Sequence, residues 1–144
     1  MTNRKTLHLE VLTQEKKVFK DSVDLILAPA HEGQIGILPG HIGLLTKLQP
    51  GELFIIKGPS ITVLAVTHGL LDVHDDQVTV MADSAARADE IDIAKVEEAK
   101  TKAEEALKQK LSDKDFAIAT AGLRKAILEL KVVKKRRQYR ALKQ

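Results

Sequence analysis

Residues 32–44 read Glu32-Gly33-Gln34-Ile35-Gly36-Ile37-Leu38-Pro39-Gly40-His41-Ile42-Gly43-Leu44, with four glycines and one proline around a short apolar run. Glycine adopts backbone angles that side chains forbid, while proline fixes φ and has no N–H donor. The segment predicts a shaped loop that reverses direction after Pro39-Gly40. It contains no serine, cysteine or lysine, so it offers no nucleophile, and one histidine makes neither a triad nor a metal site. We therefore expect a loop for contact rather than for catalysis, in which His41 either touches a partner or bonds a local carbonyl.

Around this loop, apolar residues alternate with polar ones from Leu7 to about Ala82. A period of two is typical of strands with one buried face. Turn signals recur between them, for example at Pro50-Gly51 and Asp75-Asp76-Gln77. Short strands at this spacing predict an antiparallel two-sheet β-sandwich.

The period changes after residues 83–90, which are small and charged. Residues 91–111 contain no glycine or proline and predict one amphipathic helix that starts near Asp89 or Glu90. Ser112 and Asp115 resemble a capping box, and a second apolar stripe follows it. The short break predicts an antiparallel two-helix hairpin. The fold class is thus α+β, mainly β at the N-terminus, with a sandwich domain over residues 1–86 and the hairpin over residues 87–144.

Composition excludes several classes of function. The chain has no tryptophan, one tyrosine and three phenylalanines, so it lacks the aromatic platforms of RNA-reading modules. It has no cysteine, which excludes disulfides and thiolate metal sites. No apolar run approaches the roughly 18 residues of a membrane span, and the start lacks a signal-peptide pattern. We expect a soluble, unexported protein.

The charge is strongly asymmetric. Residues 124–144 hold nine Lys or Arg and one acid, a balance of +8, whereas the rest of the chain carries −5. Seven of these cations, from Lys131 to Lys143, exceed what the helix dipole requires. The basic end predicts an acidic partner, either phosphate or protein carboxylates. A tail that binds nucleic acid nonspecifically is the alternative function, although nothing in the chain reads bases.

The seam of the predicted hairpin is rich in alanine on its first helix. Alanine buries much less surface than the residues worth about 1.5–3 kcal/mol each when fully buried. A weakly held hairpin changes conformation at a cost that a ligand or partner can supply. Switching of the hairpin is therefore a hypothesis.

Three stretches in fixed order carry a family resemblance: the 32–44 loop, His68-Gly69-Leu70-Leu71-Asp72-Val73, and Val78-Thr79-Val80-Met81-Ala82-Asp83. Together they resemble the epsilon subunit of bacterial F-type ATP synthases over nearly the whole chain. That family carries Gly-x-x-Gly-x-x-Pro-Gly-His in its β-domain and a pair of C-terminal helices. Two positions depart from the pattern, Gly43 in place of a usual proline and His68 in place of the first glycine of a pair.

The resemblance implies a non-catalytic rotor subunit of the central stalk, which couples hydrogen-ion transport to ATP synthesis. It implies that the sandwich binds the gamma subunit and the proteolipid c-ring. The contact residues it implies are Glu32, Gly33, Gln34, Gly36, Pro39, Gly40 and His41. Gln34 replaces a frequent Glu there. It also implies a peripheral location on the cytoplasmic face of the bacterial plasma membrane, reached only through the complex, and no nucleic-acid partner.

For the C-terminal helix, the resemblance implies that an extended form enters the catalytic head, contacts its alpha and beta subunits and arrests ATP hydrolysis. An acidic segment of beta would receive the basic end of this chain. The inhibitory residues implied are Lys131, Lys134, Lys135, Arg136, Arg137 and Arg140.

Ile91-Asp92-Ile93-Ala94-Lys95 resembles the Ile/Leu-Asp-x-x-Arg motif through which some epsilon subunits bind ATP. Lys95 lacks the planar fork of the arginine, and Lys125 and Glu129 align with two further arginines. An acid facing a triphosphate is unfavourable. We therefore expect no cofactor, with weak ATP binding through Asp92 and Lys95 as an alternative. We also expect no metal site, because the potential ligands in His74-Asp75-Asp76 are predicted to form a solvated hairpin turn.

Overall fold

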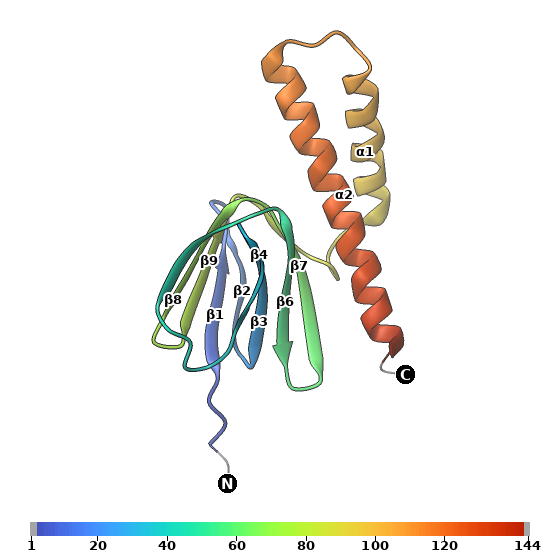
Figure 1. The fold of residues 1–144 in the computed structure, drawn as a ribbon. Coiled ribbons are helices and arrows are strands. Elements are labelled where there is room, and N and C mark those ends of the chain that lie inside the picture. The colour runs from blue at the N-terminus through green and yellow to red at the C-terminus, as the bar shows by residue number, and fades with distance from the viewer. Residues whose placement is uncertain (1–2, 143–144) are drawn as a thin grey trace. The chain divides into compact units, whose positions relative to one another are not determined.

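The structure is a computed structural model that describes residues 3–142. The chain divides into two compact units, residues 1–87 and residues 88–144. The first unit is built of strands and the second of helices (Figure 1).

The described part of the first unit forms ten strands in one continuous sheet, in the order β10-β7-β6-β3-β5-β8-β9-β1-β2, with β4 paired to β3. The sheet curls around one core, so its two halves form the layers of the predicted sandwich (Figure 1). The strands are β1 (Leu7–Leu12), β2 (Lys17–Val23), β3 (Leu25–Ala30), β4 (Gly33–Ile37), β5 (Leu44–Leu48), β6 (Gly51–Lys57), β7 (Ser60–Val66), β8 (Gly69–His74), β9 (Gln77–Ala82) and β10 (Ala85–Arg87).

The core of the sandwich is aliphatic, as the composition indicates. Along β1, Leu7, Leu9 and Val11 are buried, while His8 is exposed between them. The same alternation contributes residues from both halves of the sheet, including Ile26, Leu53, Leu71 and Val80. Alternating apolar residues therefore decide which face of each strand enters the core.

One pairing differs from the predicted antiparallel arrangement. β1 runs parallel to β9, with Leu9 opposite Val78 and Val11 opposite Val80. Alternation reports which face of a strand is buried and not the direction of its neighbour. The prediction is therefore wrong for this pair. Most of the other strands lie between β1 and β9 in the sequence.

Gly69 occupies a position where two strands approach closely. A Cβ built there would overlap the carbonyl oxygen of Met81 and come within 2.8 Å of the Cα of Ala82 on β9. Only glycine fits without a shift of backbone atoms. This explains the glycine that precedes Leu71 and Val73 in the predicted strand.

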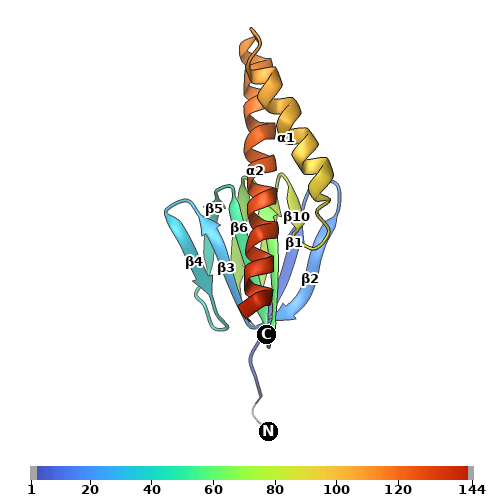
Figure 2. The same ribbon diagram turned by 90° about the vertical axis from the view of Figure 1, so that its right-hand side faces the viewer.

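The second unit is an antiparallel pair of helices, α1 (Ile93–Leu107) and α2 (Asp113–Leu142) (Figures 1 and 2). Asp92 caps α1, because its Oδ1 accepts the N–H of Lys95 at 3.3 Å. The helix thus begins later than the predicted Asp89 or Glu90 and ends before the predicted residue 111. The Ser112 half of the predicted capping box is confirmed, since the N–H of Asp115 donates to Ser112 Oγ at 3.2 Å.

The two helices differ in length by a factor of two, with 15 residues in α1 and 30 in α2. At 1.5 Å per residue, α1 can accompany only about the first half of α2. None of the α1 residues that the structure describes is buried. On α2, the apolar side chains of Phe116 and Ile127 are 54% and 48% exposed. Thin packing of this kind fits the alanine-rich seam.

Neither helix of the described chain is long and apolar enough to cross a membrane.

Candidate functional site

The seven predicted contact residues lie at and between the two ends of strand β4. Glu32 precedes this strand, and His41 follows it with the Pro39-Gly40 turn. Five strand residues span roughly 16 Å. The prediction of one loop is therefore wrong for Gly33–Ile37, and the structure does not bring Glu32 and His41 together. Paired glycines in a short apolar run looked like a loop, but β3 provides a full antiparallel partner for this segment.

At one end of β4, the β3–β4 turn is hydrogen-bonded to the last part of β5 and to the connection that follows β5. The N–H of His31 donates to the carbonyl oxygen of Lys47 at 3.2 Å. Gln49 Nε2 donates to His31 Nδ1 at 2.6 Å. The side chains of Glu32 and Gln34 remain exposed, beside a shallow depression lined by residues 30–32, Ile35 and residues 44–47. This end can therefore present one carboxylate and one amide to a partner.

At the other end, Leu38 to His41 form a β-turn. The N–H of His41 donates to the carbonyl oxygen of Leu38 at 3.1 Å, and Gly40 has φ +84°. Proline at the second position and a positive φ at the third define a type II turn. The ring Nδ1–H of His41 donates to the carbonyl oxygen of Ile42 at 2.7 Å. The local bond weighed for His41 is thus present, and its contact role stays a prediction.

The β8–β9 turn, which the sequence predicts only as a solvated hairpin turn, provides the residue that holds the Pro39-Gly40 turn. Asp76 Oδ1 accepts the N–H of Gly40 at 2.6 Å across 36 residues of sequence. Asp75 and Asp76 have φ +46° and +62°, as in the type I′ turns that join hairpin strands. The predicted hairpin turn is confirmed, but the carboxylate of Asp76 is engaged rather than merely solvated. Sequence pattern cannot give a tertiary partner of this kind.

Large apolar side chains flank the same turn. Leu38 and Ile42 are 58% and 80% exposed, and Leu45, which lines the depression described above, is 67% exposed. Neighbouring exposed apolar residues are typical of interaction surfaces. The sequence prediction concentrated on glycine, proline and histidine and did not include Leu38 and Ile42, although both are visible as apolar residues beside the predicted turn.

The residues of the ATP-binding alternative have structural roles in the helical unit. Asp92 caps α1, and Lys125 Nζ lies 3.9 Å from Glu129 Oε1 along α2. Burial raises the pKa of Glu129, and the charge of Lys125 partly opposes this. The acidic side chain of Glu129 and the capping role of Asp92 are both unfavourable for binding a triphosphate. In residues 3–142, no three metal-ligating side chains gather.

The basic segment occupies the last part of α2, past the length that α1 can accompany. Its described residues are Lys131, Lys134, Lys135, Arg136, Arg137 and Arg140. Lys135 and Arg136 are half-buried, whereas the other four are exposed. Lys143 lies outside the described residues. The helix therefore carries a dense positive charge near its C-terminal end.

Two family models cover most of the chain. The beta-sandwich domain of the ATP synthase delta/epsilon chain matches residues 6–88, and the long alpha-helix domain of the same chain matches residues 89–134.

Curated relatives and solved structures agree with these models. The ATP synthase epsilon chain of Herpetosiphon aurantiacus is 44% identical over 131 residues, which cover 91% of this chain and 96% of the relative. That of Dehalococcoides mccartyi strain CBDB1 is 46% identical, with 92% and 96% covered. A chain of the Tetrahymena thermophila mitochondrial ATP synthase central stalk and c-ring shares the fold, with a TM-score of 0.61, 18% identity, and 92% and 99% covered. A chain of the Euglena gracilis mitochondrial enzyme gives a TM-score of 0.61 at 21% identity, with 90% of this chain and 78% of that chain covered. From its matched sandwich and helical domains, the chain belongs to the ATP synthase delta/epsilon chain family.

Proposed function

We propose that the sandwich unit, residues 1–86, attaches the chain to the gamma subunit and the proteolipid c-ring through the two ends of β4, and that the helical unit, residues 87–144, regulates hydrolysis. As a family member, the chain is a non-catalytic central-stalk subunit of an ATP synthase and takes part in ATP synthesis and ion transport. Its place in the cell would be peripheral, on the cytoplasmic face of the bacterial plasma membrane. Family membership favours this function over nucleic-acid binding.

The observation that supports the contact role is the turn at Pro39-Gly40. Its backbone is fixed by hydrogen bonds at both Gly40 and His41, yet Leu38 and Ile42 beside it stay largely exposed. Exposed apolar residues on an ordered backbone are suited to binding, because little conformational entropy is lost on contact. Glu32 and Gln34 at the opposite end of β4 provide a second, polar contact point.

Binding to an isolated rotor of gamma and c-ring tests this role. We expect His41→Ala and Ile42→Ser each to weaken binding about fivefold to tenfold, the range of an interface residue that contributes somewhat over 1 kcal/mol. His68→Ala is the matched control, because His68 is exposed in a different connection of the same unit. Equal affinity of all three variants and the parent chain would contradict the proposed contact.

The inhibitory role is supported by the length and charge of α2. Its basic segment projects past the span of α1 and would complement an acidic segment of a catalytic beta subunit, with alpha and beta as partners of the extended helix. No covalent chemistry is required, because inhibition by insertion depends on shape and charge.

ATP hydrolysis by a reconstituted catalytic head tests this second role. We expect a chain that ends at Leu130 to inhibit less than the full chain, and the combined glutamine variant of Lys134, Lys135, Arg136 and Arg137 to lose most of the effect. A glutamine variant of Lys100, Lys102, Lys108 and Lys110 removes the same charge near α1 and should inhibit normally. Equal inhibition by the truncated and full chains would rule out the basic segment as the inhibitor.

A further inference from the structure

We propose that Asp76 is a positioning residue, whose carboxylate holds the Pro39-Gly40 turn in the orientation that partners recognise. This inference rests on the proposed contact function and deepens it. It starts from one hydrogen bond, in which the N–H of Gly40 donates to Asp76 Oδ1 at 2.6 Å.

The bond acts on the one peptide unit that distinguishes the two common turn types. Type I and type II turns share the closing hydrogen bond, here from the N–H of His41 to the carbonyl of Leu38. They differ by a flip of the central peptide, which changes φ at the third position from about −90° to about +80°. Gly40, at +84°, is in the second state. Its N–H belongs to that central peptide, so an acceptor fixed on one side selects type II.

The backbone of Asp76 is itself fixed by hydrogen bonds and strand pairing. Its carbonyl oxygen accepts the N–H of His8 at 2.8 Å, which ties the β8–β9 turn to the start of β1. Its own φ of +62° belongs to a two-residue hairpin loop, closed by the pairing of His74 with Gln77. The carboxylate therefore extends from a backbone that three strands, β1, β8 and β9, hold in place. A fixed acceptor favours one turn state, whereas a mobile one would follow the turn.

The consequence reaches the exposed side chains next to the turn. Flipping the peptide between Pro39 and Gly40 would turn its carbonyl and N–H to opposite sides and leave Leu38 and Ile42 on a less defined backbone. A turn that visits both states must be ordered when it binds, and that ordering lowers affinity. Asp76 removes this cost without touching the partner.

Asp76 has a second, purely local explanation, since aspartate tolerates the positive φ that this hairpin turn requires. Glycine satisfies that requirement better, but has no carboxylate. Asp76→Gly therefore separates the two roles: the hairpin keeps its turn while Gly40 loses its acceptor. Asp75→Gly is the matched control, because it makes the same change at the adjacent positive-φ residue and leaves Asp76 in place.

The test measures two quantities on the full chain: hydrogen exchange of the Gly40 amide by NMR, and affinity for an isolated rotor of gamma and c-ring. For Asp76→Gly we expect at least tenfold faster exchange at Gly40, an unchanged melting temperature and about fivefold to tenfold weaker rotor binding. Asp75→Gly should match the parent in exchange and affinity. Asp76→Asn should restore both, because its amide oxygen can accept the same bond and asparagine tolerates positive φ.

Unchanged Gly40 exchange in Asp76→Gly would overturn the holding role, and parent-like rotor binding despite faster exchange would overturn the link to the partner. If the parent chain itself failed to bind the rotor, the proposed contact function would fall and take that link with it. The exchange measurement would still decide whether Asp76 holds the turn, so the two failures are distinguishable.

Discussion

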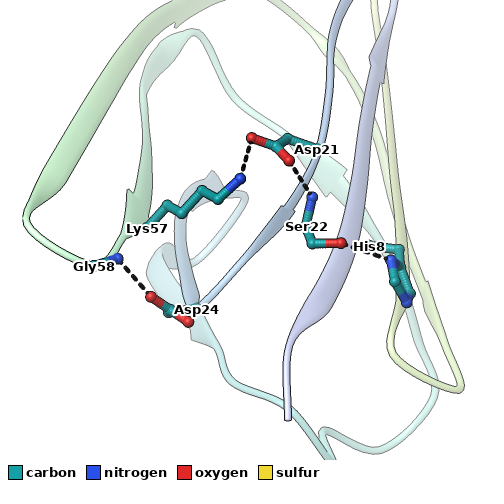
Figure 3. A network of polar contacts seen from close by, with 6 residues as sticks. All are labelled: His8, Asp21, Ser22, Asp24, Lys57 and Gly58. Atoms are coloured by element: carbon teal, nitrogen blue, oxygen red, sulfur yellow. Dashed lines mark hydrogen bonds and ion pairs between the residues drawn. The ribbon is translucent and has the colours of Figure 1, made fainter. Parts of the chain in front are cut away.

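Lys57 Nζ donates to Asp21 Oδ2 at 2.7 Å, and this contact joins β2 to β6, which are not neighbours in the sheet (Figure 3). The other oxygen of Asp21 accepts the N–H of Ser22 at 2.8 Å. Close by, the Asp24 carboxylate accepts the N–H of Gly58 at 2.6 Å. Because β2 ends the strand order, the contact between Lys57 and Asp21 ties an edge strand of the sheet to β6, a strand that it does not pair with.

Stability of the sandwich should therefore fall in acid through Asp21. The hydrogen bond from Lys57, with that from Ser22, lowers the pKa of Asp21 in the folded chain. A carboxyl whose folded pKa is depressed contributes stability above its unfolded pKa and loses it as the pH falls through the folded value. We expect Asp21→Asn to lower the urea midpoint of the sandwich modestly at pH 7, and the difference from the parent to vanish once the pH falls below the lowered pKa of the folded chain. NMR signals of the strands measure this transition.

Lys57→Gln provides the check on mechanism. If the two side chains act on each other, the double variant should be no less stable than the less stable single variant. Additive losses, or a difference from the parent that does not change with pH, would show that the ion pair is not the source of the effect.

The sequence predicted the buried faces well and the connections between strands less well. Alternation identified Leu7, Leu9 and Val11 as one face because burial acts on every second residue of a strand. It did not reveal that β1 runs parallel to β9, since pairing direction depends on residues far away in sequence. In the candidate site, too, local features were predictable and long-range contacts were not. The sequence Pro39-Gly40 predicts a turn from local backbone preferences. The hydrogen bond from Gly40 to Asp76 joins residues far apart in sequence, and no local pattern indicates it.

The stability of the helical unit should depend on pH in the opposite direction to that of the sandwich, because of Glu129. Its side chain is 14% exposed, and burial raises its pKa. A raised folded pKa contributes stability below the unfolded pKa, which is lost as the pH rises through the folded value. We expect Glu129→Gln to raise the thermal midpoint of the helices at pH 7 and to leave it unchanged near pH 3.5. Circular dichroism at 222 nm reports the helices.

The control for that effect is Glu98→Gln, because Glu98 is 65% exposed and pairs with Lys102 at 3.0 Å. It should lower the midpoint slightly or not at all, as expected for a surface pair within one helix. A Glu98→Gln gain equal to that of Glu129→Gln would assign the effect to general charge rather than to burial.

Replacement of glycine by alanine should change the unfolding free energy in opposite directions at Gly69 and Gly122. Gly69→Ala places a Cβ against the backbone of Met81 and Ala82, so we expect a loss of about 1–3 kcal/mol in the unfolding free energy of the sandwich. Gly122→Ala puts a Cβ into open space on α2, where alanine is favoured over glycine by about 1 kcal/mol. Denaturant unfolding of both variants measures the two signs. A neutral Gly69→Ala would mean that the β8–β9 pair relaxes freely.

ATP binding is the last expectation open to a direct test. Asp92 caps α1, Lys95 lacks the guanidinium fork, and Glu129 stands where a cation would be needed, so we expect no micromolar affinity in titration calorimetry. A combined variant with arginine at positions 95, 125 and 129 replaces the acid and supplies bidentate phosphate donors. If these three residues are what limits binding, that variant should gain at least tenfold in affinity over the parent. A parent chain that already binds ATP at micromolar concentration would show that capping by Asp92 and a largely buried Glu129 are compatible with a nucleotide site.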